Sequence, residues 1–217
     1  MKEVGQVEQF FDGLAGEKEP HKRIAMRNPW GPLASYRIAS KYLKGKVLDV
    51  GCGSGGLAER NPNHIFVGVD ISAKQLQNAR THLSPIRASA SHLPIKNKSF
   101  DTAVALGVVQ NSGIPAKILI GELSRTAKSI VITGLSDRKR TKDPLEVYHD
   151  PTEILRMVSE AMGNAKAEWG AIRYQEAKVW TEDWNKPDNG TFYIYASRVS
   201  PRGCTCKKRR ITLRYWH

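Results

Sequence analysis

The chain has 217 residues and a mass of 24.2 kDa, with 40% hydrophobic and 25% charged residues. This length predicts one compact domain with short appendages at most. No apolar run approaches the roughly 18 residues of a membrane-spanning helix, and the polar segment after Met1 lacks the apolar core of a secretion signal. Three cysteines are too few for a disulfide framework, so we expect a cytoplasmic protein without a membrane partner.

The net charge of +13 is unevenly distributed along the chain. Residues 200–217 carry six basic and no acidic side chains, which is nearly half of the excess. Such a tail is a candidate contact for RNA, although a flexible, solvated chain end has the same composition. The spacing of Cys204 and Cys206 within it is not that of a zinc site, and we expect no metal.

Apolar residues at helical spacing predict a helix over 4–14 and a second helix over 33–43. Further along, apolar runs predict strands at 47–50, 65–69, 85–88, 101–106, 130–133, 167–174 and 191–197, and helices at 72–83, 115–127 and 152–162. Strands that alternate with helices predict an α/β fold, a Rossmann-like doubly wound, mostly parallel seven-stranded sheet with helices on both faces. The last two strands lack a long helix between them, which predicts a hairpin and one antiparallel edge strand.

A glycine-rich turn, Gly51-Cys52-Gly53-Ser54-Gly55-Gly56, connects the strand at 47–50 to a short helix. Glycines allow a tight turn and a close approach of backbone to ligand, and the helix behind them offers unpaired N–H groups. Asp70 ends the next strand, 19 residues after Gly51, where a carboxylate can accept hydrogen bonds from ribose hydroxyls. This arrangement predicts a nucleotide-cofactor site. We expect the Asp70 carboxylate to be solvent-accessible and of little importance to fold stability.

The glycine spacing alone fits two kinds of cofactor. Gly51, Gly53 and Gly56 have the dinucleotide spacing G-x-G-x-x-G, whereas Gly51, Gly53 and Gly55 have the spacing G-x-G-x-G that is usual for S-adenosylmethionine. Asp49 lies two residues before the loop, where a carboxylate would repel a pyrophosphate but can face the ammonium group of a methionine. The flanking charge therefore favours S-adenosylmethionine over a nicotinamide dinucleotide.

Three ordered segments carry a resemblance to a known family. They are VLDVGCGSG at 47–55, VGVDIS at 67–72 with Leu76 and Ala79-Arg80 after it, and LPI at 93–95 followed by KSFD at 98–101. In these segments the chain resembles the class I S-adenosylmethionine-dependent methyltransferases, in the ubiquinone-biosynthesis-like (methyltransferase type 11) branch. The resemblance implies an enzyme that uses S-adenosylmethionine and releases S-adenosylhomocysteine. Residues 1–44 would then form a helical lid, 45–199 the methyltransferase domain and 200–217 the basic tail.

The resemblance also implies roles for individual residues. The methionine end would be held by Asp49, Gly51, Cys52, Gly53 and Gly55, the ribose by Asp70, and the adenine by Ile71, Ser89 and Ala90, with Leu106 at the start of the acceptor-facing loop. The chain departs from the family's pattern at three places, of which two bear on the site and the third is the absent K-P-G-G turn before the strand at 130–133. Ser89 stands where Asp is common, which would lower cofactor affinity. Gln110-Asn111 replaces common histidines, so no catalytic residue is assigned.

Methyl transfer is a direct displacement in which the protein mainly aligns the nucleophile and excludes water. Gln110 and Asn111 could orient an acceptor amine or hydroxyl, or be ordinary loop amides, and His149 could be a general base or a surface residue. No Asp/Asn-Pro-Pro-Tyr/Phe segment, which is typical of enzymes that methylate bases, follows the strand at 101–106. We therefore expect an unidentified small-molecule acceptor. An RNA methyltransferase and a non-catalytic S-adenosylmethionine-fold binding module are the alternatives.

Overall fold

A computed structural model describes residues 4–15, 31–111, 113–135, 147, 149–163, 165–174, 180–182 and 190–198. The basic tail at 200–217 and part of the segment at 1–44 lie outside these described residues.

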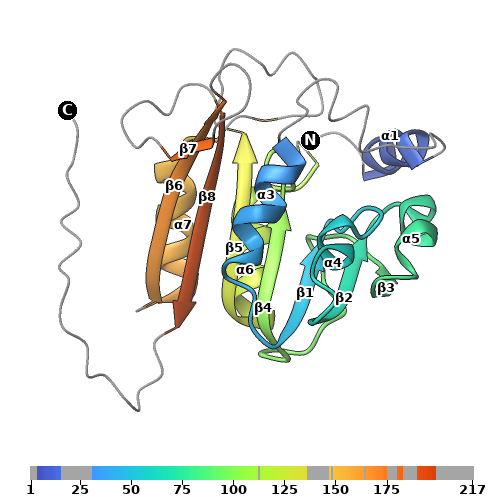
Figure 1. Cartoon of the computed structure of the whole chain (residues 1–217), viewed down its shortest axis with the longest axis horizontal. Helices are drawn as coiled ribbons and strands as arrows, with labels where there is room; N and C mark the ends of the chain where they lie inside the picture. The colour runs from blue at the N-terminus through green and yellow to red at the C-terminus, as the bar shows by residue number, and fades with distance from the viewer. Residues whose placement is uncertain are drawn as a thin grey trace.

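The described strands form one sheet in the order β3-β2-β1-β4-β5-β8-β6-β7 (Figure 1). The strands are β1 (Lys46–Val50), β2 (Ile65–Asp70), β3 (Ser84–Arg87), β4 (Phe100–Leu106), β5 (Ala127–Leu135), β6 (Ala165–Tyr174), β7 (Trp180–Glu182) and β8 (Gly190–Arg198). Strands β1 to β5 are parallel to one another. Strand β8 is antiparallel to both β5 and β6. The predicted Rossmann-like, doubly wound, mostly parallel fold is confirmed, and each of the seven predicted strands is present.

The sheet differs in detail from the expectation at its antiparallel edge. Strand β8 lies between β5 and β6, with Ile194 opposite Ile132 on one side and Trp169 on the other. Every residue from Phe192 to Ala196 is buried, as in a strand that is covered on both faces, and this explains its internal position. The three-residue strand β7 adds an eighth strand, antiparallel to β6, at the edge of the sheet.

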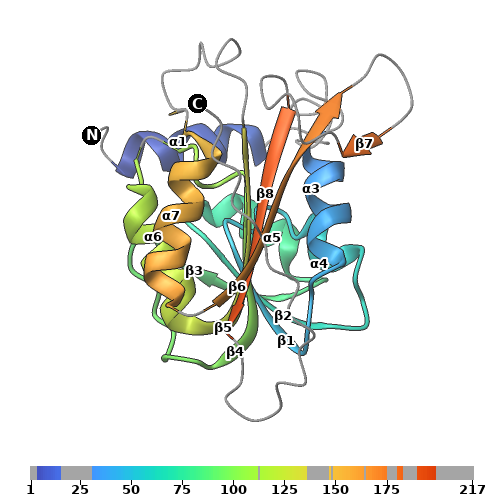
Figure 2. The same ribbon diagram turned by 90° about the vertical axis from the view of Figure 1, so that its left-hand side faces the viewer.

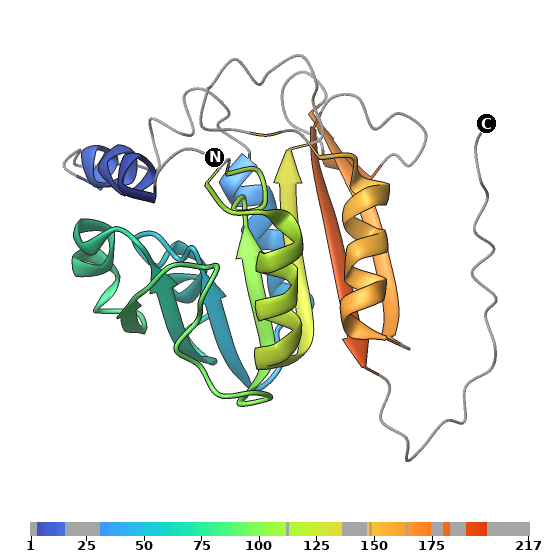
Figure 3. The same cartoon turned by 180° about the vertical axis from the view of Figure 1, so that it is seen from behind.

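Helices cover both faces of the sheet. Helices α6 (Ala116–Thr126) and α7 (Pro151–Met162) lie on one face, and α3 (Gly31–Ser40) and α4 (Gly56–Glu59) on the other (Figures 2 and 3). Helix α5 (Ala73–Ala79) shares the buried cluster of α3 and α4. Ser72 caps α5 by accepting the N–H of Gln75, and Asp150 caps α7 by accepting the N–H of Thr152, as the sequence predicts.

Two hydrophobic clusters, one on each face, form the core. Leu48 and Val50 of β1 belong to the cluster under α6 and α7, whereas Val47 belongs to the cluster under α3, α4 and α5. Successive strand residues point to opposite faces, so β1 is buried on both sides. Polar groups of the strands are therefore accessible mainly at the strand ends, where we expect the functional site.

The first two described helices differ in their contacts. Helix α3 packs against β4, β8 and α4, and its Ile38 and Ala39 are buried in the core. Helix α1 (Val4–Ala15) contacts α5. That residues 1–44 act as a lid remains a prediction. Among the described residues no helix is long and apolar enough to cross a membrane.

Candidate cofactor-binding site

The glycine loop after β1 has a backbone that only glycines adopt easily. Gly51, Gly53 and Gly55 have φ angles of 74°, 53° and 83°. The N–H groups of Gly51 and Cys52 both donate to the carbonyl of Val69, at 2.7 and 3.1 Å, which ties the loop to β2. A Cβ on Gly51 would lie 2.4 Å from Cγ2 of Val108. The loop is thus a tightly fixed backbone cradle that a larger residue at Gly51 would disrupt.

Asp70 ends β2 and holds the opposite side of this loop. Its Oδ2 accepts the N–H of Gly53 at 2.8 Å, and its Oδ1 accepts the N–H of Ser72 at 2.9 Å. Burial raises the pKa of Asp70, and these backbone hydrogen bonds lower it in part. Asp70 is half-buried, and because it also fixes the loop we expect it to contribute to fold stability, contrary to the sequence-based expectation. Each carboxylate oxygen has a further lone pair, which leaves capacity for a ribose diol.

Asp49 lies near the end of β1 and is only 3% exposed. Burial, and then the negative charge of Asp70, raise its pKa to about 7. Within the described part of the chain no cationic side chain pairs with Asp49. A buried carboxylate in this state fits a positively charged ligand group, such as the methionine ammonium, which would compensate its charge.

Tyr36 of α3, which the sequence offers only as an aromatic residue for stacking or packing, is a neighbour of the glycine loop. Its hydroxyl lies 2.8 Å from where a Cβ on Gly56 would stand, and the Arg60 guanidinium covers its ring at 5.4 Å. Burial, followed by the charge of Asp49, raises the pKa of Tyr36 to about 12. Tyr36 lies on the apolar side of a helix that is separate in sequence from the loop. No local sequence pattern could therefore have shown that it lies beside Gly56.

Cys52 is turned toward β2. A Cβ on Gly68 would lie 2.7 Å from its Sγ, and burial raises the pKa of the thiol above its ordinary value. A contribution of Cys52 to ligand binding would therefore come from its backbone.

The residues expected around the adenine lie at the carboxyl ends of β2 and β3. Ala88 donates its N–H to the carbonyl of Asp70 at 3.1 Å, which links the two strand ends. The hydroxyl of Ser89 contacts that of Ser91 at 2.8 Å, and Ala90 is buried. Ile71 is half-buried directly after Asp70. Leu106 stands apart from this group, at the end of β4 on the other side of β1.

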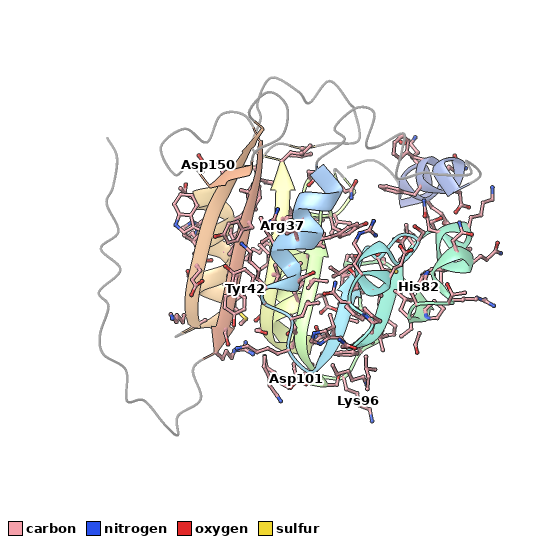
Figure 4. All side chains as sticks on the ribbon, viewed as in Figure 1. Arg37, Tyr42, His82, Lys96, Asp101 and Asp150 are labelled. Atoms are coloured by element: carbon pink, nitrogen blue, oxygen red, sulfur yellow. The ribbon has the colours of Figure 1, made fainter. Side chains whose placement is uncertain are left out.

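Helix α1 covers the carboxyl end of β2. The Ser72 hydroxyl donates to Oδ1 of Asp12 at 2.5 Å, and Gln75 donates to the carbonyl of Phe11 at 3.5 Å. Glu8 forms an ion pair with Arg87 of β3. Asp101, at the start of β4, lies at the opposite end of the sheet from α1 (Figure 4). The described polar contacts of α1 with Ser72, Gln75 and Arg87 thus lie near the carboxyl ends of β2 and β3.

The segment after β4 lies against the glycine loop through Val108. Gly107, with φ of 71°, donates its N–H to the Thr133 carbonyl at 3.0 Å, and Gln110 accepts the N–H of Val147 at 2.6 Å. His149 is half-buried, two residues after Val147. Tyr148 and the basic run at 138–142 lie outside the described residues.

A positive-φ glycine loop and an acid at the next strand end, in a doubly wound sheet, define a Rossmann-like domain that binds a nucleotide cofactor. Residues 48–129 match the family model described as a methyltransferase domain. This match and the fold support a class I S-adenosylmethionine-dependent methyltransferase domain, with S-adenosylmethionine as its cofactor. The glycine cradle, the buried Asp49 and the spare acceptor capacity of Asp70 fit this cofactor.

The chain is similar to several known proteins. Over 114 residues it is 29% identical to a tRNA (carboxymethyluridine(34)-5-O)-methyltransferase of Saccharomyces cerevisiae, which covers 51% of this chain and 39% of the relative. A Thermotoga maritima structure, described as a methyltransferase and possible histamine N-methyltransferase, matches with TM-score 0.70 and 15% identity over 86% of this chain and 99% of that one. Magnesium protoporphyrin IX methyltransferase of Synechocystis with bound S-adenosylhomocysteine matches with TM-score 0.62 and 14% identity, over 91% and 100%.

These solved structures confirm the fold. The chain spans less than half the length of the curated relatives that it matches.

Proposed function

We propose that this protein transfers the methyl group of S-adenosylmethionine to a small-molecule acceptor. The observation that carries the choice of cofactor is the buried carboxylate of Asp49 beside the glycine cradle at Gly51, which pairs with no cationic side chain among the described residues. A dinucleotide would place a pyrophosphate near this carboxylate and be repelled, whereas the methionine ammonium would be attracted. The domain family and the local charge thus favour the same cofactor.

When bound, S-adenosylmethionine supplies a methyl group already activated on a sulfonium, so the protein's tasks are binding, orientation and exclusion of water. In this proposal Asp49 and the backbone of Gly51, Cys52, Gly53 and Gly55 hold the methionine end. Asp70 binds the ribose diol while keeping its hydrogen bond to Gly53. Ile71, Ser89 and Ala90 surround the adenine, and Leu106 leads into the acceptor-facing segment.

Two observations support a small acceptor. The sequence lacks an Asp/Asn-Pro-Pro-Tyr/Phe segment after β4. The contacts of Asp12 and Phe11 with α5 bring α1 over one side of the site, which narrows the approach for a large substrate. We further propose a cytoplasmic location, which the free thiol of Cys52 supports.

RNA is the second candidate acceptor. The net charge of +13 and the tRNA-modifying activity in the names of two relatives favour it. In that case the basic tail would contact the RNA, whereas in the small-molecule case it would remain solvated.

Calorimetry with S-adenosylhomocysteine and with NAD tests the cofactor, and tritium transfer from methyl-labelled S-adenosylmethionine tests the acceptor. We expect S-adenosylhomocysteine to bind and NAD not to bind. Histamine and unfractionated tRNA are the two acceptor probes. Binding of NAD alone would overturn the proposal. Label in tRNA would replace the small-molecule acceptor with RNA, and binding with no transfer to any acceptor would favour a non-catalytic module.

A further inference from the structure

Gln110 carries a buried polar atom that the fold leaves unused. Its side-chain oxygen Oε1 is inaccessible to solvent and has no hydrogen-bond partner among the described residues. A buried acceptor without a donor destabilises a protein, and native structures keep few of them. An unused acceptor is therefore a pointer to a donor that arrives from outside the chain.

The backbone around Gln110, in contrast, is well satisfied. Its own carbonyl accepts the N–H of Val147 at 2.6 Å, and the N–H of Asn111 donates to the Val108 carbonyl at 3.0 Å. The side-chain nitrogen of Gln110 lies 3.5 Å from where a Cβ on Gly107 would stand, so the amide folds back over the end of β4. The backbone of this segment is thus held in place, whereas no hydrogen bond holds the side-chain oxygen.

The position of this segment connects Gln110 to the cofactor site. Val108, two residues before it, packs against Gly51 of the glycine loop, as a Cβ there would lie 2.4 Å from Val108 Cγ2. In a doubly wound sheet, ligands bind at the carboxyl ends of the strands, and β4 neighbours β1 at this edge. The acceptor of the methyl group would have to enter beside these two strand ends.

We propose that the Gln110 side chain turns toward the incoming methyl acceptor, that its Oε1 then accepts a hydrogen bond from an N–H of that acceptor, and that the acceptor is an amine-type nitrogen bearing hydrogen. This inference rests on the proposed function. A carboxamide can hold a proton in a hydrogen bond but cannot remove it, since it is not a base at neutral pH. A hydroxyl needs a base in the site to become a strong nucleophile, whereas an imidazole nitrogen, or an amine that has first lost the proton of its ammonium form to water, already has a nucleophilic lone pair. Gln110 is therefore suited to orient a nitrogen nucleophile of the methyl acceptor.

The step balances without a further reactant. The nitrogen lone pair forms the new bond to the methyl carbon as the carbon–sulfur bond breaks, and the electron pair of that bond remains on sulfur as a thioether. The nitrogen gains positive charge, and the methylated ammonium then releases one proton to water. As this charge develops, the N–H becomes a stronger donor to Oε1, so the hydrogen bond strengthens in the transition state. Loss of Oε1 should hence lower kcat more than it raises KM.

The first test measures thermal unfolding of Gln110→Met, which has a similar shape but no polar atoms. Removing an unsatisfied acceptor should raise Tm by about 3 °C for a chain of this size. Gln75→Met is the matched control, because Gln75 is buried and donates to the carbonyl of Phe11. Its replacement should lower Tm. A fall in Tm for Gln110→Met as large as that for Gln75→Met would overturn the inference.

The second test measures kinetics and cofactor affinity of the full chain with tritium-labelled S-adenosylmethionine, using histamine as the nitrogen probe and catechol as the hydroxyl probe. Gln110→Met should lower kcat for histamine about 10- to 100-fold, the effect of losing a hydrogen bond that becomes charged. Gln110→Glu keeps an acceptor oxygen and should lose less. Affinity for S-adenosylhomocysteine should be unchanged in both variants.

Transfer to catechol but not histamine would overturn the inference, as would a Gln110→Met variant with the kcat of the wild type or with lost S-adenosylhomocysteine binding. Failure of the wild type to bind S-adenosylhomocysteine would instead refute the proposed function. In that case the rise or fall of Tm still decides whether Gln110 is unpartnered.

Discussion

Asp49 and Asp70 lie near the carboxyl ends of the neighbouring strands β1 and β2, and burial, followed by the negative charge of Asp70, raises the pKa of Asp49. Two like charges in one buried site oppose each other, and a protonated Asp49 relieves the repulsion. The arrangement is unfavourable in the ligand-free protein and becomes favourable when a cation joins it. The site therefore exchanges fold stability for affinity toward a positively charged ligand.

The first prediction concerns pH. The folded-state pKa of Asp49, about 7, exceeds its ordinary value of 3.8, so the folded protein holds this proton more tightly than the unfolded chain. Its contribution to stability is fully present below about pH 4 and is lost as the pH rises to about 7. Urea unfolding should thus show that the free energy of unfolding of Asp49→Asn, relative to that of the wild type, rises by on the order of 2–4 kcal/mol between pH 4 and pH 8.

Affinity for the ligand should change with pH in the opposite direction. Ionised Asp49 attracts the methionine ammonium, so binding of S-adenosylhomocysteine should strengthen from pH 5 to about pH 7 and then level off. The Asn variant should bind more weakly and lack this pH dependence. Calorimetry in two buffers of different ionisation enthalpy should detect proton release by the wild type at pH 6. An identical pH profile for the two proteins would show that Asp49 does not contact the ligand.

The second prediction separates two roles of Asp70. Asp70→Ala should weaken binding of S-adenosylhomocysteine by about 1.5–3 kcal/mol, the range for a hydrogen bond to a charged group. It should also destabilise the fold by roughly 1–2 kcal/mol, because the N–H groups of Gly53 and Ser72 lose their acceptor. Asp70→Asn retains one side-chain oxygen and should restore part of the stability. Wild-type affinity in the Ala variant would refute the ribose assignment.

The third prediction concerns the glycine loop. Gly51→Ala places a Cβ 2.4 Å from Val108 Cγ2 at a φ of 74°, so the side chain clashes and the backbone is strained. We expect a loss of about 2–4 kcal/mol of stability and of measurable S-adenosylhomocysteine binding. Gly121→Ala is the control, since a Cβ there has nothing within 4 Å and Gly121 lies inside α6. It should raise stability by about 0.5–1 kcal/mol, because alanine favours a helix.

The sequence was sufficient to predict the parallel strands and the glycine loop, because these depend on local patterns. Val47 and Leu48 are apolar and face opposite sides of the sheet, as in a strand buried on both faces. The glycines at 51, 53 and 55 all have the positive φ that such a turn requires. The strand order at the antiparallel end of the sheet could not be predicted in the same way. Whether β8 pairs at the edge or inserts between β5 and β6 depends on long-range pairing, which no local pattern encodes.

In the candidate site, too, some features follow from local sequence patterns and others depend on tertiary contacts. The positions of Asp49 and Asp70 at strand ends follow from spacing, but the hydrogen bond from Gly53 to Asp70 does not. Tyr36 reaches the loop from a separate helix through tertiary packing, and the unused oxygen of Gln110 becomes visible only when every hydrogen bond around it is known.

The fourth prediction tests α1 as a lid. Asp12→Ala removes the contact with the Ser72 hydroxyl beside Asp70, so it should speed dissociation of S-adenosylhomocysteine by about 5- to 10-fold. Glu8→Gln is the control on the same helix. The ion pair of Glu8 with Arg87 is largely solvent-exposed on the arginine side, and its loss should change the rate by less than about 2-fold. Stopped-flow release measures both rates, and equal rates for the wild type and Asp12→Ala would exclude a lid role for this contact.

The fifth prediction concerns the basic tail, which lies outside the described residues and follows β8 in the sequence. Its six cations are Arg202, Lys207, Lys208, Arg209, Arg210 and Arg214. If RNA is the acceptor, these cations release counterions on binding, and deleting residues 200–217 should reduce the slope of log affinity against log salt by up to about 4–5. Affinity for S-adenosylhomocysteine should be unchanged, because the candidate cofactor site lies between residues 49 and 106.

A tail of unchanged length with all six cations replaced by serine is the matched control, since it separates charge from chain length. It should behave like the deletion when the interaction is electrostatic. If the acceptor is a small molecule, as we propose, RNA binding at physiological salt should be weak in all three proteins and no tritium should enter the RNA. Salt-sensitive, tail-dependent binding together with methyl incorporation into tRNA would overturn the small-molecule proposal. It would also exclude an amine-only acceptor if the label were found on oxygen.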